Sequence, residues 1–151
     1  CEAPISLITL LDKNRNFLKS HHGIELSESP REISFCGHAI NTSNSIMIVE
    51  DARKDERFHD NPLVTEFDAI FYAGVPLTNN EGYKLGTLCV YDRKPRTLTE
   101  EQKNALQIIA KQVVTLFEQR LQNEKLLELK ESLPKSFGRF HYVYNLLTRV
   151  F

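Results

Sequence analysis

The sequence has no excess of charge of either sign, and this limits the partners that it can bind. Nineteen Lys and Arg residues stand against twenty Asp and Glu residues, which gives a formal net charge of -1. A protein that neutralises a run of phosphates needs a basic surface, and attachment to an anionic membrane needs one too. We therefore expect neither nucleic acid nor a membrane as a partner.

Long hydrophobic runs and a cysteine framework are missing as well. The longest apolar stretches fall far short of the roughly 20 residues that span a bilayer. Three cysteines among 151 residues, an odd number, favour free thiols over a disulfide framework. These features predict a cytoplasmic protein, and the length fits one domain with its own core.

Motifs of common enzyme classes are absent too. No Ser-His-Asp order, paired-carboxylate motif or HExxH motif occurs, so hydrolysis has no support. Cys36 and His38 form one close Cys/His pair, whereas a structural zinc site needs about four ligands at short paired spacing. We therefore expect no metal site and no enzymatic activity in this domain.

Five segments have the apolar and β-branched composition of strands. The last two are joined by Thr78–Gly82, whose Asn and Gly residues suit a hairpin turn with positive φ. The expected strands are Ala3–Leu11, Phe17–His22, Ser45–Glu50, Ala69–Leu77 and Leu85–Tyr91. Because the sequence starts almost within its first strand, we expect it to be a piece of a longer protein.

Neither Ala69–Leu77 nor Leu85–Tyr91 has a clearly polar face. A sheet that is apolar on both faces must be covered on both. The sequence therefore predicts an α+β fold, with a central antiparallel sheet of five to six strands and helices on both faces.

Two helices and a mixed loop are expected to provide that cover. Pro30–Ile40 has the pattern of a short helix, with Ser34 as a candidate cap. Asp51–Asp68 suits a loop with one or two short helical turns. Thr99 and Gln102 have the spacing of a capping box, which predicts a long C-terminal helix over about residues 99–133.

The apolar stripe of that helix changes along its length. Its first half is wide enough to pack on a sheet, and consists of Leu106, Ile109, Ala110, Val113, Leu116 and Phe117. The stripe thins at Gln122–Glu124 and resumes more narrowly, which suits a solvated helix or pairing with a second copy. Residues 1–133 thus form the expected domain. Residues 134–151 have no assignment: they suit a linker, the start of a following domain, or a segment docking on the sheet.

Several motifs resemble those of one bacterial subgroup of GAF domains, a subgroup common in sensor histidine kinases and diguanylate cyclases. The resemblance covers about Ala3 to Leu121, with the motifs in the family's order. They are Ser34–Ile40 (SFCGHAI), Asp51–Val64 (DARKDERFHDNPLV), Phe71–Leu77 (FYAGVPL), Leu85–Asp92 (LGTLCVYD) and Pro95–Gln102 (PRTLTEEQ).

The resemblance implies a GAF/PAS-like sensor that is not itself an enzyme. A small-molecule ligand would lie between the sheet and the segments after the second and third strands. Terminal helices would pair in a homodimer and carry a signal to an output domain of the parent chain. The N-terminal helix of the family is missing from this sequence. Neither the ligand nor any cofactor is identified by these motifs.

Candidate ligand-binding residues follow from the implied pocket. Arg57 lies in the loop expected to cover it and is the first candidate for an anionic group, through a bidentate contact. Phe35, Phe58 and Tyr72 would supply an apolar or stacking wall, although each equally suits plain core. The remaining candidates are Cys36, His38 and Cys89, of which the cysteines also suit small buried hydrophobes.

Two other functions stay open. Some GAF-fold proteins reduce free methionine sulfoxide through cysteines, which requires an exposed thiolate of low pKa. Cys36 suits that role better than Cys89, which lies within a strand. A pure dimerisation scaffold, with an interior filled by side chains, is the third hypothesis. The Asn-Lys-x-x-Phe-x-x-x-Asp-Glu pattern of cyclic-nucleotide-binding GAF domains does not occur.

Overall fold

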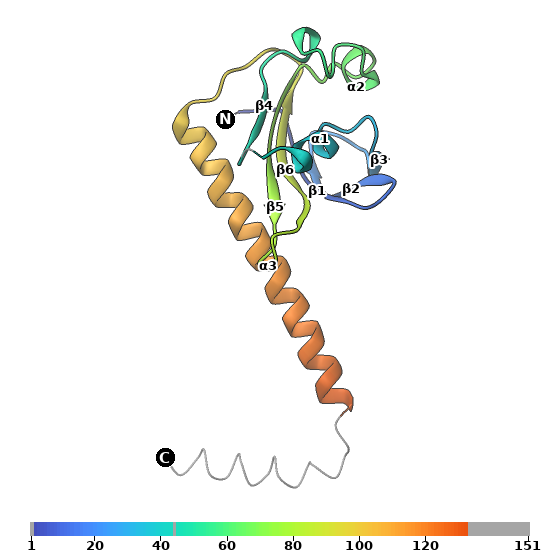
Figure 1. The fold of residues 1–151 in the computed structure, drawn as a ribbon, viewed down its shortest axis with the longest axis vertical. Helices are drawn as coiled ribbons and strands as arrows, with labels where there is room; N and C mark the ends of the chain where they lie inside the picture. Colours follow the sequence, from blue (N-terminus) through green and yellow to red (C-terminus); the bar gives the residue numbers. More distant parts are fainter. Residues whose placement is uncertain (1, 44, 133–151) are drawn as a thin grey trace, which may run out of the picture. The chain divides into compact units, whose positions relative to one another are not determined.

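The computed structural model describes residues 2–43 and 45–132 and contains a six-stranded sheet, whose arrangement is drawn in Figure 1. The strand order is β3-β2-β1-β6-β5-β4, and every neighbouring pair is antiparallel. The strands are β1 (Ile5–Leu11), β2 (Arg15–His22), β3 (Glu28–Pro30), β4 (Met47–Val49), β5 (Phe71–Thr78) and β6 (Lys84–Asp92). The predicted antiparallel sheet is confirmed.

Helical segments lie on both sides of this sheet, as predicted (Figure 1). They are α1 (Phe35–Asn41), the single 3-10 turn η1 (Ala52–Lys54), α2 (Pro62–Thr65) and α3 (Glu100–Ser132). The loop between β4 and β5 contains η1 and α2, so the expected mixture of loop and short helical turns is also confirmed. None of the helices in the described ranges is long and apolar enough to cross a membrane.

The central strands β5 and β6 are buried along almost their whole length. Their register pairs Tyr72 with Tyr91 and Gly74 with Cys89, so these residues share one face, which α1 covers. On the other face, Val75 lines a surface hollow together with Ala110 and Val114 of α3. Two apolar faces are thus covered by two different helices, which removes both from water.

Two residues, Gly82 and Asn79, stabilise the turn of the β5–β6 hairpin in different ways. Gly82 has a φ of 86°, in the left-handed region that glycine enters without strain. Asn79 acts through its side chain instead, because its Oδ1 accepts hydrogen bonds from the backbone N–H groups of Glu81 and Tyr83. The expected hairpin is confirmed, with only the glycine at positive φ.

The predicted helix Pro30–Ile40 starts too early, and a strand was missed there. Pro30 ends β3, which pairs with the start of β2, and the helix begins only at Phe35. Proline is tolerated at such an edge position because its missing N–H is not needed there. Ser34 is the helix cap, as expected: its side chain accepts a hydrogen bond from the Gly37 N–H.

The helix α3 begins with the predicted capping box. The Thr99 N–H donates to the Gln102 side chain, and the Gln102 N–H donates to the Thr99 hydroxyl. The buried stripe is narrower than predicted, because Ile109 and Leu116 are 50% and 62% exposed. Only Leu106, Ala110, Val113 and Val114 are buried among the described residues of this helix.

The chain divides into two compact units within α3, the first ending at Thr115 and the second starting at Leu116. The second unit contains large exposed apolar side chains at Leu121, Leu126, Leu127 and Leu129. The last residue of the predicted helix, residue 133, and the unassigned segment 134–151 lie outside the described residues.

Replacing Thr99 by Ala should remove one half of the capping box and lower the free energy of unfolding by about 1 kcal/mol. Thr97→Ala, the same change at an exposed threonine two residues earlier, is the matched control and should change it little. Urea unfolding followed by circular dichroism measures both. Equal effects of the two substitutions would contradict the assigned role of Thr99.

Candidate functional site

The first turn of α1 brings two apolar side chains onto the sheet. Phe35 and Cys36 are completely buried, because the cap at Ser34 fixes where the helix begins and hence which residues face the strands. Phe35 stacks on Phe58 with ring centroids 4.1 Å apart, and its ring lies 5.2 Å from that of Tyr72. Tyr72 in turn contacts Tyr91 edge to face, at 4.9 Å.

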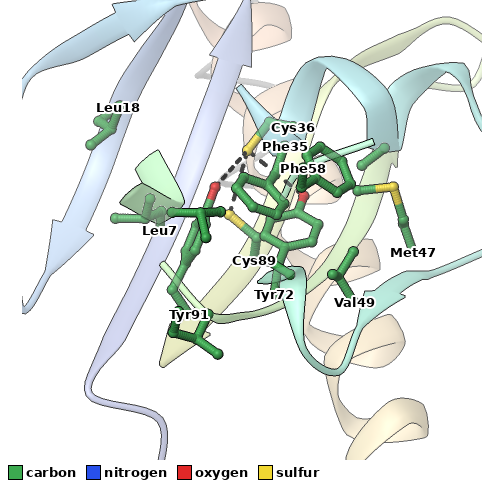
Figure 2. Packing of buried hydrophobic residues seen from close by; sticks show 14 residues of the cluster. Leu7, Leu18, Phe35, Cys36, Met47, Val49, Phe58, Tyr72, Cys89 and Tyr91 are labelled. Atoms are coloured by element: carbon green, nitrogen blue, oxygen red, sulfur yellow. Dashed lines mark hydrogen bonds between the residues drawn. The ribbon is translucent and has the colours of Figure 1, made fainter. Parts of the chain in front are cut away.

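We call Phe35, Phe58, Tyr72 and Tyr91 the aromatic cluster (Figure 2). All four residues are buried, and the rings meet in the stacked and edge-to-face arrangements that aromatic pairs prefer. They come from α1, the η1–α2 segment and two strands. The cluster therefore ties α1 and the loop before β5 to the sheet, and it fills the space between them.

Two buried thiols meet at the centre of this cluster. The Sγ atoms of Cys36 and Cys89 are 3.7 Å apart, and the hydroxyls of Tyr72 and Tyr91 lie 3.7 and 3.8 Å from Cys36 Sγ. Figure 2 shows these three contacts as dashed lines converging on Cys36. Gly74 makes the arrangement possible, since a Cβ there would lie 2.0 Å from the Tyr72 hydroxyl oxygen.

The environment separates the pKa values of the two thiols. Burial alone would raise the pKa of Cys36, but hydrogen bonds from Cys89, nearby threonines and Tyr72 hold it below its ordinary value. Burial raises the pKa of Cys89 well above its ordinary range, and its hydrogen bond to Cys36 adds to this. Both side chains have no exposed surface, so neither sulfur meets a molecule in solution.

Arg57 and His38, the two polar candidates, lie at the surface beside the cluster. The Arg57 guanidinium donates through Nε and Nη2 to the two oxygens of Asp55, at 2.9 and 2.6 Å, and lies 5.0 Å above the Phe58 ring. His38 is exposed and contacts the edge of the same ring. The negative charge of Asp55 thus balances the positive charge of Arg57. The hydrogen bonds that the Arg57 guanidinium donates lower the pKa of the Asp55 carboxyl.

The structure therefore brings together five of the seven sequence candidates, Phe35, Cys36, Phe58, Tyr72 and Cys89, in one packed region. Contact of any of the seven with a ligand stays a prediction from the sequence. An open space lies next to this region, and all seven residues are outside its lining.

That space is an apolar cavity of about 330 Å³ over the β1–β2 side of the same sheet face. Its walls come from β1, β2, the chain around β3, the α2–β5 loop and the end of β6. Apolar side chains predominate in the lining, among them Ile5, Leu7, Leu18, Ile24, Ile33 and Leu63. Tyr91 contributes to both the cavity wall and the aromatic cluster. Figure 2 shows Leu18 apart from the cluster, with Leu7 between them.

Two large apolar side chains in the lining are also open to solvent. Leu26 is 40% exposed and Phe67 is 62% exposed. They belong to the loop between β2 and β3 and to the α2–β5 loop, where Asp68 has a φ of 55°. The cavity is therefore bordered by apolar groups on irregular segments, which are the parts of a fold that move most readily.

Sequence reasoning missed this lining for a specific reason. The alternation of β2, in which Asn16 and Leu18 are buried and their neighbours exposed, was the available signal for two of its residues. The loop residues around Ile24 and Phe67 carry no periodicity that assigns them to a wall. Within residues 2–43 and 45–132, no group of three or more His, Cys, Asp or Glu side chains is placed to hold a metal ion.

Comparison with known proteins places this geometry in a family. The model of the GAF domain family matches residues 2–116. A cyclic di-GMP phosphodiesterase of Pseudomonas aeruginosa is 42% identical over 106 residues, which cover 70% of this chain. The match covers only 18% of the length of that relative.

Two solved structures illustrate the range of proteins with this fold. The GAF domain of an Acinetobacter phosphoenolpyruvate-protein phosphotransferase has a TM-score of 0.63 at 20% identity, covering 82% of this chain and 76% of that one. Free methionine-R-sulfoxide reductase of Neisseria meningitidis, solved with its substrate, has a TM-score of 0.64 at 18% identity, covering 80% and 71%. At these identities the likeness shows the fold alone.

Burial of the two thiols predicts that they are unreactive in the native chain. In a Cys1→Ser background, Ellman's reagent should label neither Cys36 nor Cys89 until denaturant is added, and both afterwards, because the reagent reacts with accessible thiolates. Absorbance at 412 nm measures the labelling. Labelling of Cys36 within minutes under native conditions would contradict this account and restore the thiol-enzyme hypothesis.

Asp92 at the end of β6 predicts a pH-dependent contribution to stability. Burial acts to raise its pKa, but hydrogen bonds from the Arg96 side chain and the Arg93 backbone outweigh this and lower it. A group with a lowered folded-state pKa stabilises the fold above its unfolded pKa, roughly 3.9, and the stabilisation is lost as pH falls through the folded value. Asp92→Asn should therefore reduce the free energy of unfolding at pH 7, and progressively less as the pH falls below about 4.

Urea unfolding at a series of pH values measures this difference. Asp60→Asn, at an aspartate whose side chain is 84% exposed, is the matched control and should have little effect at any pH. A penalty for Asp92→Asn that stays constant as the pH falls would show that it arises from lost packing and not from the charge.

Proposed function

The chain belongs to the GAF domain family, and from that premise we propose that it is a regulatory sensor domain of a bacterial signalling protein. A small molecule occupies the cavity beside the aromatic cluster, and α3 carries the effect to an output domain of the parent chain. The cytoplasm is its expected location, in keeping with two cysteines held as free thiols. The relative that acts on cyclic di-GMP supports the signalling context.

The observation that carries this proposal is the cavity itself. Its volume of about 330 Å³ is at the lower end of the range of small-molecule sites, roughly 300–1,000 Å³, which are mostly apolar in lining. The space is partly open to solvent, and apolar side chains form most of its wall. The exposed apolar side chains of Leu26 and Phe67 at its border would be covered once a ligand brings the two loops together.

A short covalent route supports transmission from the cavity to α3. Tyr91 and Asp92 line the cavity at the end of β6, and Asp92 is held by Arg96 through an ion pair. The Arg96 backbone N–H also donates to the Glu50 carbonyl, at 3.2 Å. Three residues later the capping box of α3 begins. A ligand that shifts the end of β6 therefore shifts the residues that fix the start of the helix, which biases its arrangement.

The second unit of α3 supports a role in pairing. Leu121, Leu126 and Leu129 are exposed, and large apolar side chains that gather on a surface commonly mark a site of protein–protein contact. Pairing with the same helix of a second copy would cover them, so we propose a homodimer as the signalling state.

A thiol-dependent enzyme and a pure scaffold are less well supported. Reduction of methionine sulfoxide needs a thiolate that contacts the substrate, whereas Cys36 and Cys89 are both completely buried. A scaffold needs no cavity, whereas an apolar one is present. The domain is therefore proposed as regulatory and non-catalytic, with the ligand-binding role given to the cavity.

Filling the cavity should abolish ligand retention. In the double variant Ile24→Trp/Leu63→Trp, two lining side chains are replaced by larger ones, and Lys19→Trp, at an exposed position of β2, is the matched control. The 151-residue chain is incubated with bacterial extract, recovered by gel filtration, denatured, and its released small molecules are identified by mass spectrometry.

The expected result is a compound that is enriched with the original chain and with Lys19→Trp but absent from the double variant, whose fold is checked by circular dichroism. Retention of the same compounds by all three chains, or by none of them, would refute the cavity as a sensing site.

A further inference from the structure

Every charged side chain that lines the cavity is acidic. Glu25, Glu28, Asp68 and Asp92 contribute to its wall, and the lining contains no Lys, Arg or His among the described residues. Two of the four carboxylates are matched by cations, since Glu28 pairs with Arg15 at 2.8 Å and Asp92 pairs with Arg96. The lining therefore offers a negative or neutral environment, in which an anionic ligand would be repelled.

Glu25 and Asp68, unlike Glu28 and Asp92, have no ion-pair partner among the described residues. Both are exposed. They lie on the two irregular segments that also carry Leu26 and Phe67. A molecule that enters between these segments thus passes unpaired negative charge, which selects against phosphates and carboxylates.

One buried polar atom of the cavity-lining residues lacks a hydrogen bond. Asn16 lines the cavity and is only 3% exposed. Its Nδ2 group donates to Ser29 Oγ at 3.4 Å, while its Oδ1 has no hydrogen-bond partner among the described residues. Buried acceptors are nearly always satisfied, so one that is not points to a missing donor. Oδ1 is itself buried in this arrangement, so the amide must turn about its Cβ–Cγ bond, away from Ser29, before Oδ1 accepts a hydrogen bond from a guest.

From these observations we infer the chemical class of the ligand. It is a small, mainly apolar and uncharged molecule with one O–H or N–H group, and that group donates a hydrogen bond to Asn16 Oδ1. Anionic compounds, including phosphate-bearing nucleotides, do not enter the cavity. This inference rests on the proposed function, because it names what the sensing cavity binds.

The size of the cavity and the residue types around it agree with this class. A volume of about 330 Å³ accommodates a bicyclic aromatic compound, and the apolar side chains of Leu7, Leu18 and Ile24 would cover its rings. Arg57, the sequence candidate for an anionic group, does not line the cavity and is engaged by Asp55.

Three matched probes test the inference: 2-naphthol, 2-methoxynaphthalene and 2-naphthoate. They share one ring system and differ in carrying a neutral donor, an acceptor only, or a negative charge. Dissociation constants come from titrations of the 151-residue chain followed by amide NMR shifts of cavity residues. We expect 2-naphthol to bind about fivefold more tightly than the methoxy compound, the value of one ordinary hydrogen bond, and 2-naphthoate to bind more than tenfold more weakly than 2-naphthol.

Asn16→Leu removes the acceptor while keeping a side chain of similar size. Because it removes an unsatisfied buried acceptor together with one long hydrogen bond, that of Nδ2 to Ser29 Oγ at 3.4 Å, its melting temperature should change little. In this variant 2-naphthol and 2-methoxynaphthalene should bind equally. Asn14→Leu, the same change at an exposed asparagine outside the cavity lining, is the control and should keep the preference for 2-naphthol.

Three results would overturn the inference. They are equal or tighter binding of 2-naphthoate, a preference for 2-naphthol that survives Asn16→Leu, and the absence of NMR shifts at cavity residues with any probe. The first two leave the cavity as a binding site and so spare the proposed function. After the third result, the extract experiment described above separates the two proposals. If the chain retains a compound from extract, only the inferred ligand class is wrong. If it retains none, the proposed sensing function is wrong as well.

Discussion

The stacking of Phe35 on Phe58, at 4.1 Å, is the contact on which the arrangement of this domain depends. It joins α1 to the η1–α2 segment over one end of the sheet, and Tyr72 and Tyr91 complete the filling beneath it. The space over β5 and β6 is thereby packed, down to two thiols 3.7 Å apart. Over β1 and β2, the cavity lining contains only two aromatic rings, those of Tyr91 and of the exposed Phe67. The space over this part of the same sheet face is therefore not filled.

This division of one sheet face explains how a sensor can be stable and still have room for a guest. The aromatic cluster excludes water and fixes α1, while the cavity is bordered by the irregular segments between β2 and β3 and between α2 and β5. Tyr91 belongs to both regions, and the residue after it, Asp92, binds Arg96 just before α3. Under the proposed function, a ligand in the cavity acts on Tyr91 and on the start of α3, and this arrangement favours a shift of population between two states.

The sequence was sufficient to predict the sheet, because β5 and β6 lack a polar face and must be covered twice, and to predict α3, because Thr99 and Gln102 form a local capping box. It was not sufficient around Pro30, where three residues pair with β2 through backbone contacts that leave almost no compositional signal. The cysteines and aromatic residues named as candidates lie together in the structure, but whether such a group is a packed core or a ligand wall depends on how the space between the side chains is filled. The true cavity wall was missed because its loop residues lack any periodic pattern.

The central claim is that the hollow over β1 and β2 is built to hold an uncharged guest. A crystal structure of the chain purified from bacterial cells tests it most directly. The account predicts electron density for a compact organic molecule against Leu7, Leu18 and Tyr91, with a polar atom within hydrogen-bond distance of Asn16 Oδ1. A hollow that is closed by inward rotation of Leu26 and Phe67, with Asn16 satisfied by the protein itself, would contradict it.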